Sequence, residues 1–172
     1  MYVSRKAVIH AVILAGSVAM NCSAGAEEIF IQAITPYAEN AQVRDAVRQE
    51  CELDSKLPAF VQQYAKANGM AVALKSDSLD TRKGKVLVLE ITNVTAPGGG
   101  AWSGAKSMSI AGKLYDHGKL VGDFTGSRYS GGGFFGGYKG TCSIVGRCSK
   151  ALGKDVADWL KNPVRDAHLG DS

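Results

Sequence analysis

The sequence lacks the short motifs that usually mark nucleotide, metal and hydrolase sites. It contains neither GxxxxGKS nor GxxxxGKT, no GxSxG nucleophile motif and no HExxH zinc motif. Histidine is also scarce, with 3 in 172 residues. We therefore predict no catalytic, cofactor-binding or metal-binding residue and no cofactor. Whether the chain is an enzyme stays open at this point, with a non-enzymatic role favoured.

Long apolar runs are absent beyond the first 26 residues. Within them, Arg5 and Lys6 precede an apolar run over 7–20, and small residues ending at Ala26 follow it. This order is typical of a secretory signal peptide. We expect residues 1–26 to be removed by cleavage after Ala26, which predicts a periplasmic mature chain.

A lipid anchor is the less favoured alternative for the mature N-terminus. Cys22 could be acylated after cleavage, but Asn21 occupies the position where a lipoprotein signal has a small residue. No later segment is apolar enough to span a bilayer, so we expect no transmembrane span in the mature chain.

Strong charge of either sign is also missing. The full chain carries 20 basic and 16 acidic residues, and removing Arg5 and Lys6 leaves 18 against 16. The minimum evidence for nucleic-acid binding is a basic patch on a recognised fold. The mature domain is nearly neutral, and the modest basic bias around Lys139, Arg147, Lys150 and Lys154 is interpreted as a solvated helix face. We therefore expect no nucleic-acid partner.

Cysteine is present in an odd number once the signal peptide is removed: Cys51, Cys142 and Cys148 remain. Pairing of Cys142 with Cys148 is favoured, with a bond from Cys51 to either of them as the alternative. A continuous helix would hold Cys142 and Cys148 about 9 Å apart along its axis, too far for a disulfide. The favoured pair therefore requires a helix that begins near Cys148, after Gly146. A thiol-redox role, with Cys148 activated at a helix N-terminus, is considered less favoured than a structural disulfide.

The apolar spacing predicts helices and strands in a definite order. A strand over 28–34 is followed by a helix capped by Asn40 and by a second helix with Pro58 in its first turn. Strands are then predicted over 70–74, 85–95, 107–115 and 119–129, with a tight hairpin at 116–118. Cys148, Leu152, Val156 and Trp159 share one face of a last helix, which ends before Pro163.

This order predicts a single α+β domain over 27–163. We expect a mostly antiparallel twisted sheet of about five strands, with one parallel contact. Two N-terminal helical segments and the C-terminal helix should pack on one face of it. Residues 164–172 are expected to form a flexible tail.

A glycine-rich stretch, 131–140, lies just before the last helix. It carries four side chains that suit a binding surface, and we take them as a candidate binding loop: Phe134, Phe135, Tyr138 and Lys139. Aromatic side chains dominate the energetics of many interfaces. Packing of Phe134 and Phe135 into the core is the alternative.

Two segments, VRQECELDSKLPAF and GGGFFGGYKGTCSIVGRCSKALGKDVADWL, resemble an uncharacterised family of exported bacterial cell-envelope proteins. The resemblance implies a Gram-negative periplasmic setting and carries over no site residue. The favoured hypothesis is a non-enzymatic envelope domain that binds another envelope protein or a cell-wall polymer. A hydrolase using His117 near Asp116 and Asp123, or a thiol-redox protein, is the alternative.

Overall fold

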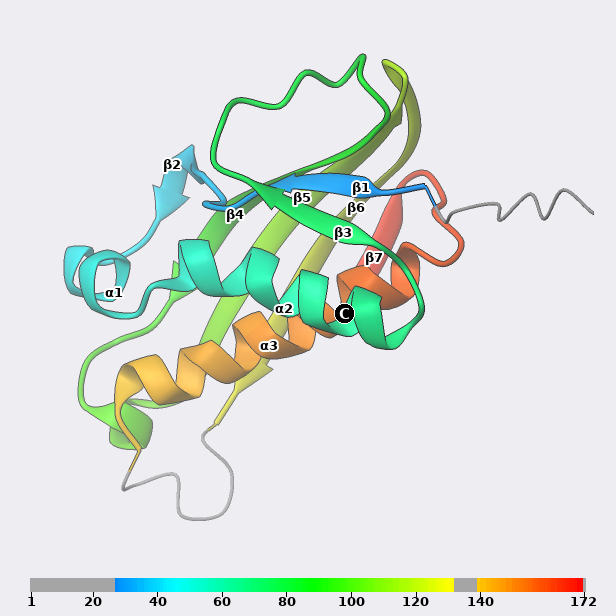
Figure 1. The fold of residues 1–172 in the computed structure, drawn as a ribbon. Helices are drawn as coiled ribbons and strands as arrows, with labels where there is room; N and C mark the ends of the chain where they lie inside the picture. The colour runs from blue at the N-terminus through cyan, green and yellow to red at the C-terminus, as the bar shows by residue number, and fades with distance from the viewer. Residues whose placement is uncertain (1–26, 132–138, 172) are drawn as a thin grey trace, which may run out of the picture.

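A mixed β-sheet organises the part of the chain that the computed structural model describes, residues 27–131 and 139–171 (Figure 1). The signal-peptide prediction for 1–26 lies outside the described residues. The described elements are β1 (Ile29–Gln32), β2 (Tyr37–Gln42), α1 (Asp45–Glu50), α2 (Leu53–Ala67), β3 (Val72–Lys75), β4 (Lys85–Thr95), the 3-10 turn η1 (Gly100–Ser103), β5 (Lys106–Asp116), β6 (Lys119–Ser130), α3 (Thr141–Trp159) and β7 (Ala167–Gly170).

The sheet has seven strands within these ranges, in the order β3-β1-β4-β5-β6-β7, and β2 also pairs with β4. β1 and β2 lie one after the other along the same side of β4, both parallel to it. β3 is parallel to β1, and β7 is parallel to β6. Only the β4–β5 and β5–β6 pairs are antiparallel. The class is α+β, but the prediction of a mostly antiparallel sheet of about five strands is wrong.

The segment 37–42 accounts for part of this difference. We predicted a helix capped by Asn40, whereas β2 occupies that stretch and α1 begins only at Asp45. The backbone N–H of Ile91 donates to the carbonyl of Pro36, and Arg48 lies over the Tyr37 ring, 4.2 Å from its centroid. These contacts with β4 and α1 hold 37–42 as a strand, so the helix starts at Asp45 and not at Asn40.

The second helix begins earlier than predicted. α2 starts at Leu53, so Pro58 lies inside it and leaves the carbonyl of Asp54 without its usual helical donor. The backbone N–H of Thr35 donates to that carbonyl at 2.9 Å. The proline is therefore tolerated because the segment between β1 and β2 supplies the missing hydrogen bond.

The C-terminal segment differs from the expected flexible tail, because β7 lies within 164–171. Arg128 on β6 donates to Asp155 of α3 at 2.8 and 2.9 Å and to Asp171, just after β7, at 2.6 Å. This ion-pair cluster joins β6, α3 and the end of the chain. A four-residue strand that ends in glycine has no alternating pattern long enough to predict it.

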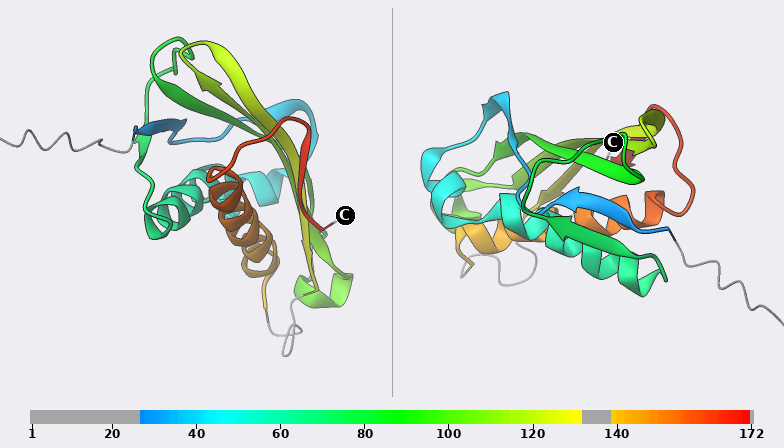
Figure 2. Two further views of the ribbon diagram at one scale, coloured as in Figure 1. Left: turned by 90° about the vertical axis from the view of Figure 1, so that its right-hand side faces the viewer. Right: turned by 45° about the horizontal axis from the view of Figure 1, so that its top comes forward.

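The core lies between one face of the sheet and the helices α2 and α3, which Figure 2 shows together on that side. The predicted apolar face of α3 is buried, including Cys148, Leu152 and Val156. The Trp159 ring meets Phe124 of β6 edge to face, with centroids 4.8 Å apart. Side chains alternate along β5, so its residues at 107, 109, 111 and 113 point to the opposite, open face of the sheet.

Candidate functional site

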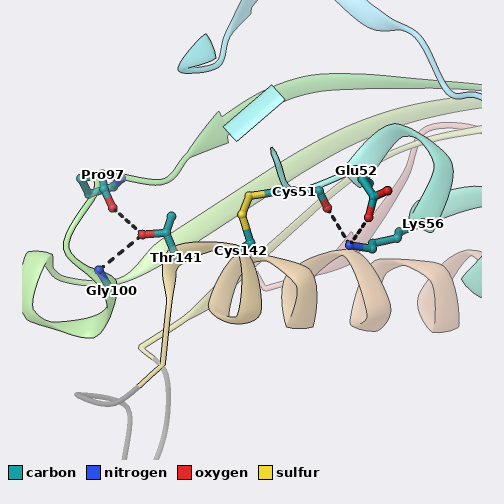
Figure 3. Close-up of a disulfide and its surroundings, with 7 residues drawn as sticks. All are labelled: Cys51, Glu52, Lys56, Pro97, Gly100, Thr141 and Cys142. Atoms are coloured by element: carbon teal, nitrogen blue, oxygen red, sulfur yellow. Dashed lines mark hydrogen bonds and ion pairs between the residues drawn. A yellow bond between two sulfur atoms is a disulfide. The ribbon is translucent and has the colours of Figure 1, made fainter. Parts of the chain in front are cut away.

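The disulfide joins Cys51, at the α1–α2 junction, to Cys142 in the first turn of α3 (Figure 3). Their Cα atoms are 4.9 Å apart, within the usual disulfide range. The favoured pairing of Cys142 with Cys148 is therefore replaced by one of the alternatives left open. Its condition fails because α3 begins at Thr141, which places both cysteines on one continuous helix.

Cys148 is the free thiol among the described cysteines, and it is buried. Its Sγ donates to the backbone carbonyl of Lys106 at 3.5 Å. Burial, and to a smaller extent the carboxylate of Asp171, raises the pKa of Cys148 to about 11. This shift is opposite to the one that activates a redox cysteine, because it suppresses the thiolate.

The predicted binding loop lies largely outside the described residues, which exclude Phe134, Phe135 and Tyr138. Lys139 is described, and its backbone carbonyl lies against Gly100 in η1. Gly100 has φ +59°, and a Cβ added there would collide with that carbonyl. The chain thus enters α3 directly beside η1.

Two strongly exposed aromatic side chains lie at this end of the sheet, which we call the aromatic end: Trp102 in η1, 86% exposed, and Tyr129 near the end of β6, 68% exposed. Tyr129 pairs with Ser107, at the start of β5 just after η1. The turn that carries Trp102 is held by Ser103, whose Oγ donates toward the carbonyls of Gly100 and Pro97.

Lys106, the first residue of β5, also stabilises this turn. Its side chain is fully buried, and Nζ donates to Ser103 Oγ at 2.8 Å and to the carbonyl of Gly104 at 3.0 Å. Thr141, at the start of α3, donates to the carbonyl of Pro97 and accepts from the N–H of Gly100 (Figure 3). The exposed indole is therefore presented by a turn that is tied to both β5 and α3.

A shallow pocket of about 250 Å³ lies on the open face of the sheet, and one of its lining residues, Ser127, precedes Tyr129 by two positions on β6. We call it the hydroxyl pocket, and the polar side chains that line it are Thr92, Ser109, Thr125, Ser127, His168 and Asp171. They come from β4, β5, β6 and the β7 segment. Ser109 and Ser127 share a hydrogen bond of 3.2 Å, and Thr125 Oγ1 lies 3.0 Å from His168 Nδ1.

Sequence reasoning missed this pocket. His168 was placed in the tail, and Thr125 and Ser127 follow no catalytic or binding motif. The one usable signal is the alternation of β5 and β6, which puts Ser109, Thr125 and Ser127 on a single face.

The other histidine considered for chemistry, His117, lies at the tip of the β5–β6 hairpin, as predicted. Its Nδ1 is 2.6 Å from Asp116 Oδ1, and Glu27 comes close enough for the three side chains to offer ligand atoms within 4.8 Å of one another. Glu27 is already paired with Lys85 Nζ at 3.0 Å. Asp123, the second carboxylate of the hydrolase hypothesis, bonds to Arg165 instead.

No family model and no curated protein matches this chain. Among solved structures, it is similar to the PelC dodecamer from Paraburkholderia phytofirmans, at 14% identity over 74% of this chain and 86% of that one, with a TM-score of 0.46. A single-substitution variant of that PelC gives 15% identity, 74% and 87% coverage and a TM-score of 0.47. A minor lipoprotein from Acinetobacter baumannii gives 11% identity, 78% and 92% coverage and a TM-score of 0.40.

With TM-scores below 0.5, these likenesses assign neither a function nor an assembly to this chain. Within residues 27–131 and 139–171, none of the helices has the length and apolar character needed to cross a membrane.

Proposed function

We propose that this chain is an exported, non-enzymatic binding domain of the cell envelope, whose partner is another envelope protein or a cell-wall polymer. The observation that carries the proposal is the aromatic end, where Trp102 and Tyr129 are 86% and 68% exposed on a well-anchored part of the fold. Exposing two large aromatic rings at one end of a sheet loses the free energy of burying them, which a binding partner recovers. The candidate loop residues Phe134, Phe135, Tyr138 and Lys139 belong to the same proposal, because Lys139 adjoins η1.

The Cys51–Cys142 bond supports an oxidising location for the domain, since disulfides persist in exported proteins and are rare in the cytosol. With the signal-like residues 1–26, it favours a periplasmic chain that starts at Glu27. Intact mass of protein recovered from the envelope tests this directly. We expect a chain from Glu27 with one disulfide and one alkylatable thiol after denaturation, whereas a chain starting at acylated Cys22 refutes the soluble form.

Binding is favoured over hydrolysis by the surroundings of the exposed Thr125–His168 pair on the open face. Thr125 and His168 are both exposed, and the nearby Asp171 carboxylate is engaged by Arg128 and by the N–H of Tyr129. A nucleophile activated by histidine normally has a carboxylate or amide that orients the imidazole in a water-excluding site. A thiol-redox role is disfavoured by the raised pKa of Cys148.

A cross-linking pull-down from envelope extract tests the aromatic end. Trp102→Ala should abolish capture of the partner and leave thermal stability within about 2 °C, as expected for an exposed position. Phe134→Ala with Phe135→Ala, made separately, should also abolish capture. Val164→Ala is the matched control, because Val164 is also exposed but lies at the other end of β6, near Asp123. Unchanged capture by both variants would contradict the proposal.

A further inference from the structure

The hydroxyl pocket has the chemistry of a site for a neutral, polyhydroxylated ligand. A hydroxyl group donates one hydrogen bond and accepts two. The Ser109–Ser127 and Thr125–His168 bonds use only part of that capacity, and the Oγ of Thr92 adds a further donor and acceptor. The pocket therefore offers several donors and acceptors side by side, which is what a sugar ring with adjacent hydroxyl groups requires.

The charges around the pocket argue for a neutral ligand. None of its lining residues is a lysine or arginine, so an anionic group finds no cationic side chain in the lining. Its single carboxylate, Asp171, accepts from Arg128 at 2.6 Å and from the N–H of Tyr129 at 3.1 Å. That carboxylate is thus already compensated, and a cation gains little there.

The volume of the pocket and the nearby position of Tyr129 on β6 suit the binding of one monomer unit of a polymer. At about 250 Å³ it lies below the range of about 300–1,000 Å³ typical of pockets that enclose a whole drug-sized ligand. Tyr129 lies two residues after Ser127, on the same face of β6, and its exposed ring offers a flat apolar surface on that face, beyond the residues that line the pocket. Hydrogen bonds from the pocket and ring contact from Tyr129 together match the polar rim and apolar faces of a sugar.

The geometry points to the hydroxyl pocket as a binding site for one sugar unit of a neutral glycan, with the rest of the glycan lying along the open sheet face toward the aromatic end. This inference rests on the proposed function for the role of the domain in binding. It adds the class of ligand and a set of residues that the aromatic end does not contain.

Titration with neutral hexasaccharides tests the inference on the full mature chain, using cellohexaose, maltohexaose and chitohexaose as probes. Thr125→Val with Ser127→Ala removes two hydroxyls while keeping small side chains on the strand. We expect at least one probe to bind, and its Kd to rise about tenfold or more in the variant, as the loss of one to two hydrogen bonds predicts. Thr81→Val with Ser78→Ala is the matched control, because it removes the same two groups from the β3–β4 connection.

Three results would overturn the inference: no neutral hexasaccharide binds at millimolar concentration, the pocket variant binds as well as the wild type, or polygalacturonate competes with the neutral probe more strongly than the neutral sugars do. Thermal unfolding of both variants establishes that they are folded. If the sugars fail but the pull-down still depends on Trp102, the glycan inference falls and the proposed function stands. If capture in the pull-down does not depend on Trp102 either, both the glycan inference and the proposed function are refuted.

Discussion

Gly153 is the residue at which α3 approaches α2 most closely among the described glycines of that helix. A Cβ added at Gly153 would lie 2.5 Å from Phe60 Cβ, and 3.1 Å from both the carbonyl carbon of Phe60 and the backbone nitrogen of Val61. All three atoms are fixed by the backbone of α2, so no side-chain rotation relieves the contact. Gly153→Ala must therefore push the two helices apart.

Two effects of opposite sign decide the outcome of Gly153→Ala. Alanine is favoured over glycine inside a helix by about 1 kcal/mol. Overpacking a well-packed interface costs about 1–3 kcal/mol, and a 2.5 Å contact against fixed atoms belongs at the upper end of that range. We expect the clash to win, with a net loss of about 1–2 kcal/mol in the free energy of unfolding.

Gly146 supplies the internal control, because it lies in the same helix with nothing within 4 Å of an added Cβ. There the helix propensity acts alone, so Gly146→Ala should stabilise the domain by up to about 1 kcal/mol. Urea unfolding followed by circular dichroism measures both variants, and a change of 1 kcal/mol corresponds to about 2–4 °C in Tm for a domain of this size. A Gly153→Ala variant as stable as Gly146→Ala would refute the close packing of α2 on α3.

Two further predictions concern Cys148 and Arg128. The raised pKa of Cys148 means that the folded state keeps its proton while the unfolded state loses it, so stability should fall as pH rises from about 9 to about 11, by about 2 kcal/mol or somewhat more. Cys148→Ala should show a smaller fall over that window, and an equal fall in urea titrations would contradict burial of the thiol. Arg128→Met should cost about 1–3 kcal/mol and speed hydrogen exchange at β7, because it leaves two carboxylates unpaired. Arg82→Met, which breaks the exposed pair with Asp80, should leave stability almost unchanged, and equal effects of the two substitutions would argue against a stabilising role of the Arg128 cluster.

The long elements of this fold were predictable because their own sequence carries the signal. β4 occupies Lys85–Thr95, the predicted bounds, and the β5–β6 hairpin turns at His117 and Gly118, both with positive φ. Each of these segments has at least eleven residues, so its apolar pattern extends over several positions of one face. Burial on one face then selects a single register.

The short strands could not be predicted, because they form through pairing with neighbouring strands and not through a pattern in their own sequence. β2 has six residues, the predicted helix began inside them at Asn40, and pairing with β4 makes the stretch a strand instead. β7 has four residues and is held by β6 and the Arg128 cluster. These two strands account for two of the parallel pairings and for much of the error in the predicted sheet.

The disulfide shows how one helix boundary controls a chemical prediction. The sequence alone allows three pairings, and the choice among them depends on where α3 starts. With Gly146 as the start, Cys142 lies outside the helix and can turn back to Cys148. With Thr141 as the start, Cys142 lies in the first turn of α3 and is bonded to Cys51 at the α1–α2 junction. Cys148, further along the same helix, is buried in the core.

The hydroxyl pocket depends both on alternation that is visible in the sequence and on strand pairing that is visible only in the structure. Alternation along β5 and β6 places Ser109, Thr125 and Ser127 on one face, and this much is legible in the sequence. The pocket becomes a site only when β7 adds His168 beside Thr125, and the parallel register that does so cannot be read from a segment so short. The Arg128 cluster that holds β7 in place also engages the Asp171 carboxylate. The ion pair with Arg128 therefore holds Asp171 in the pocket lining and compensates its charge, so Arg128→Met should weaken sugar binding as well as stability.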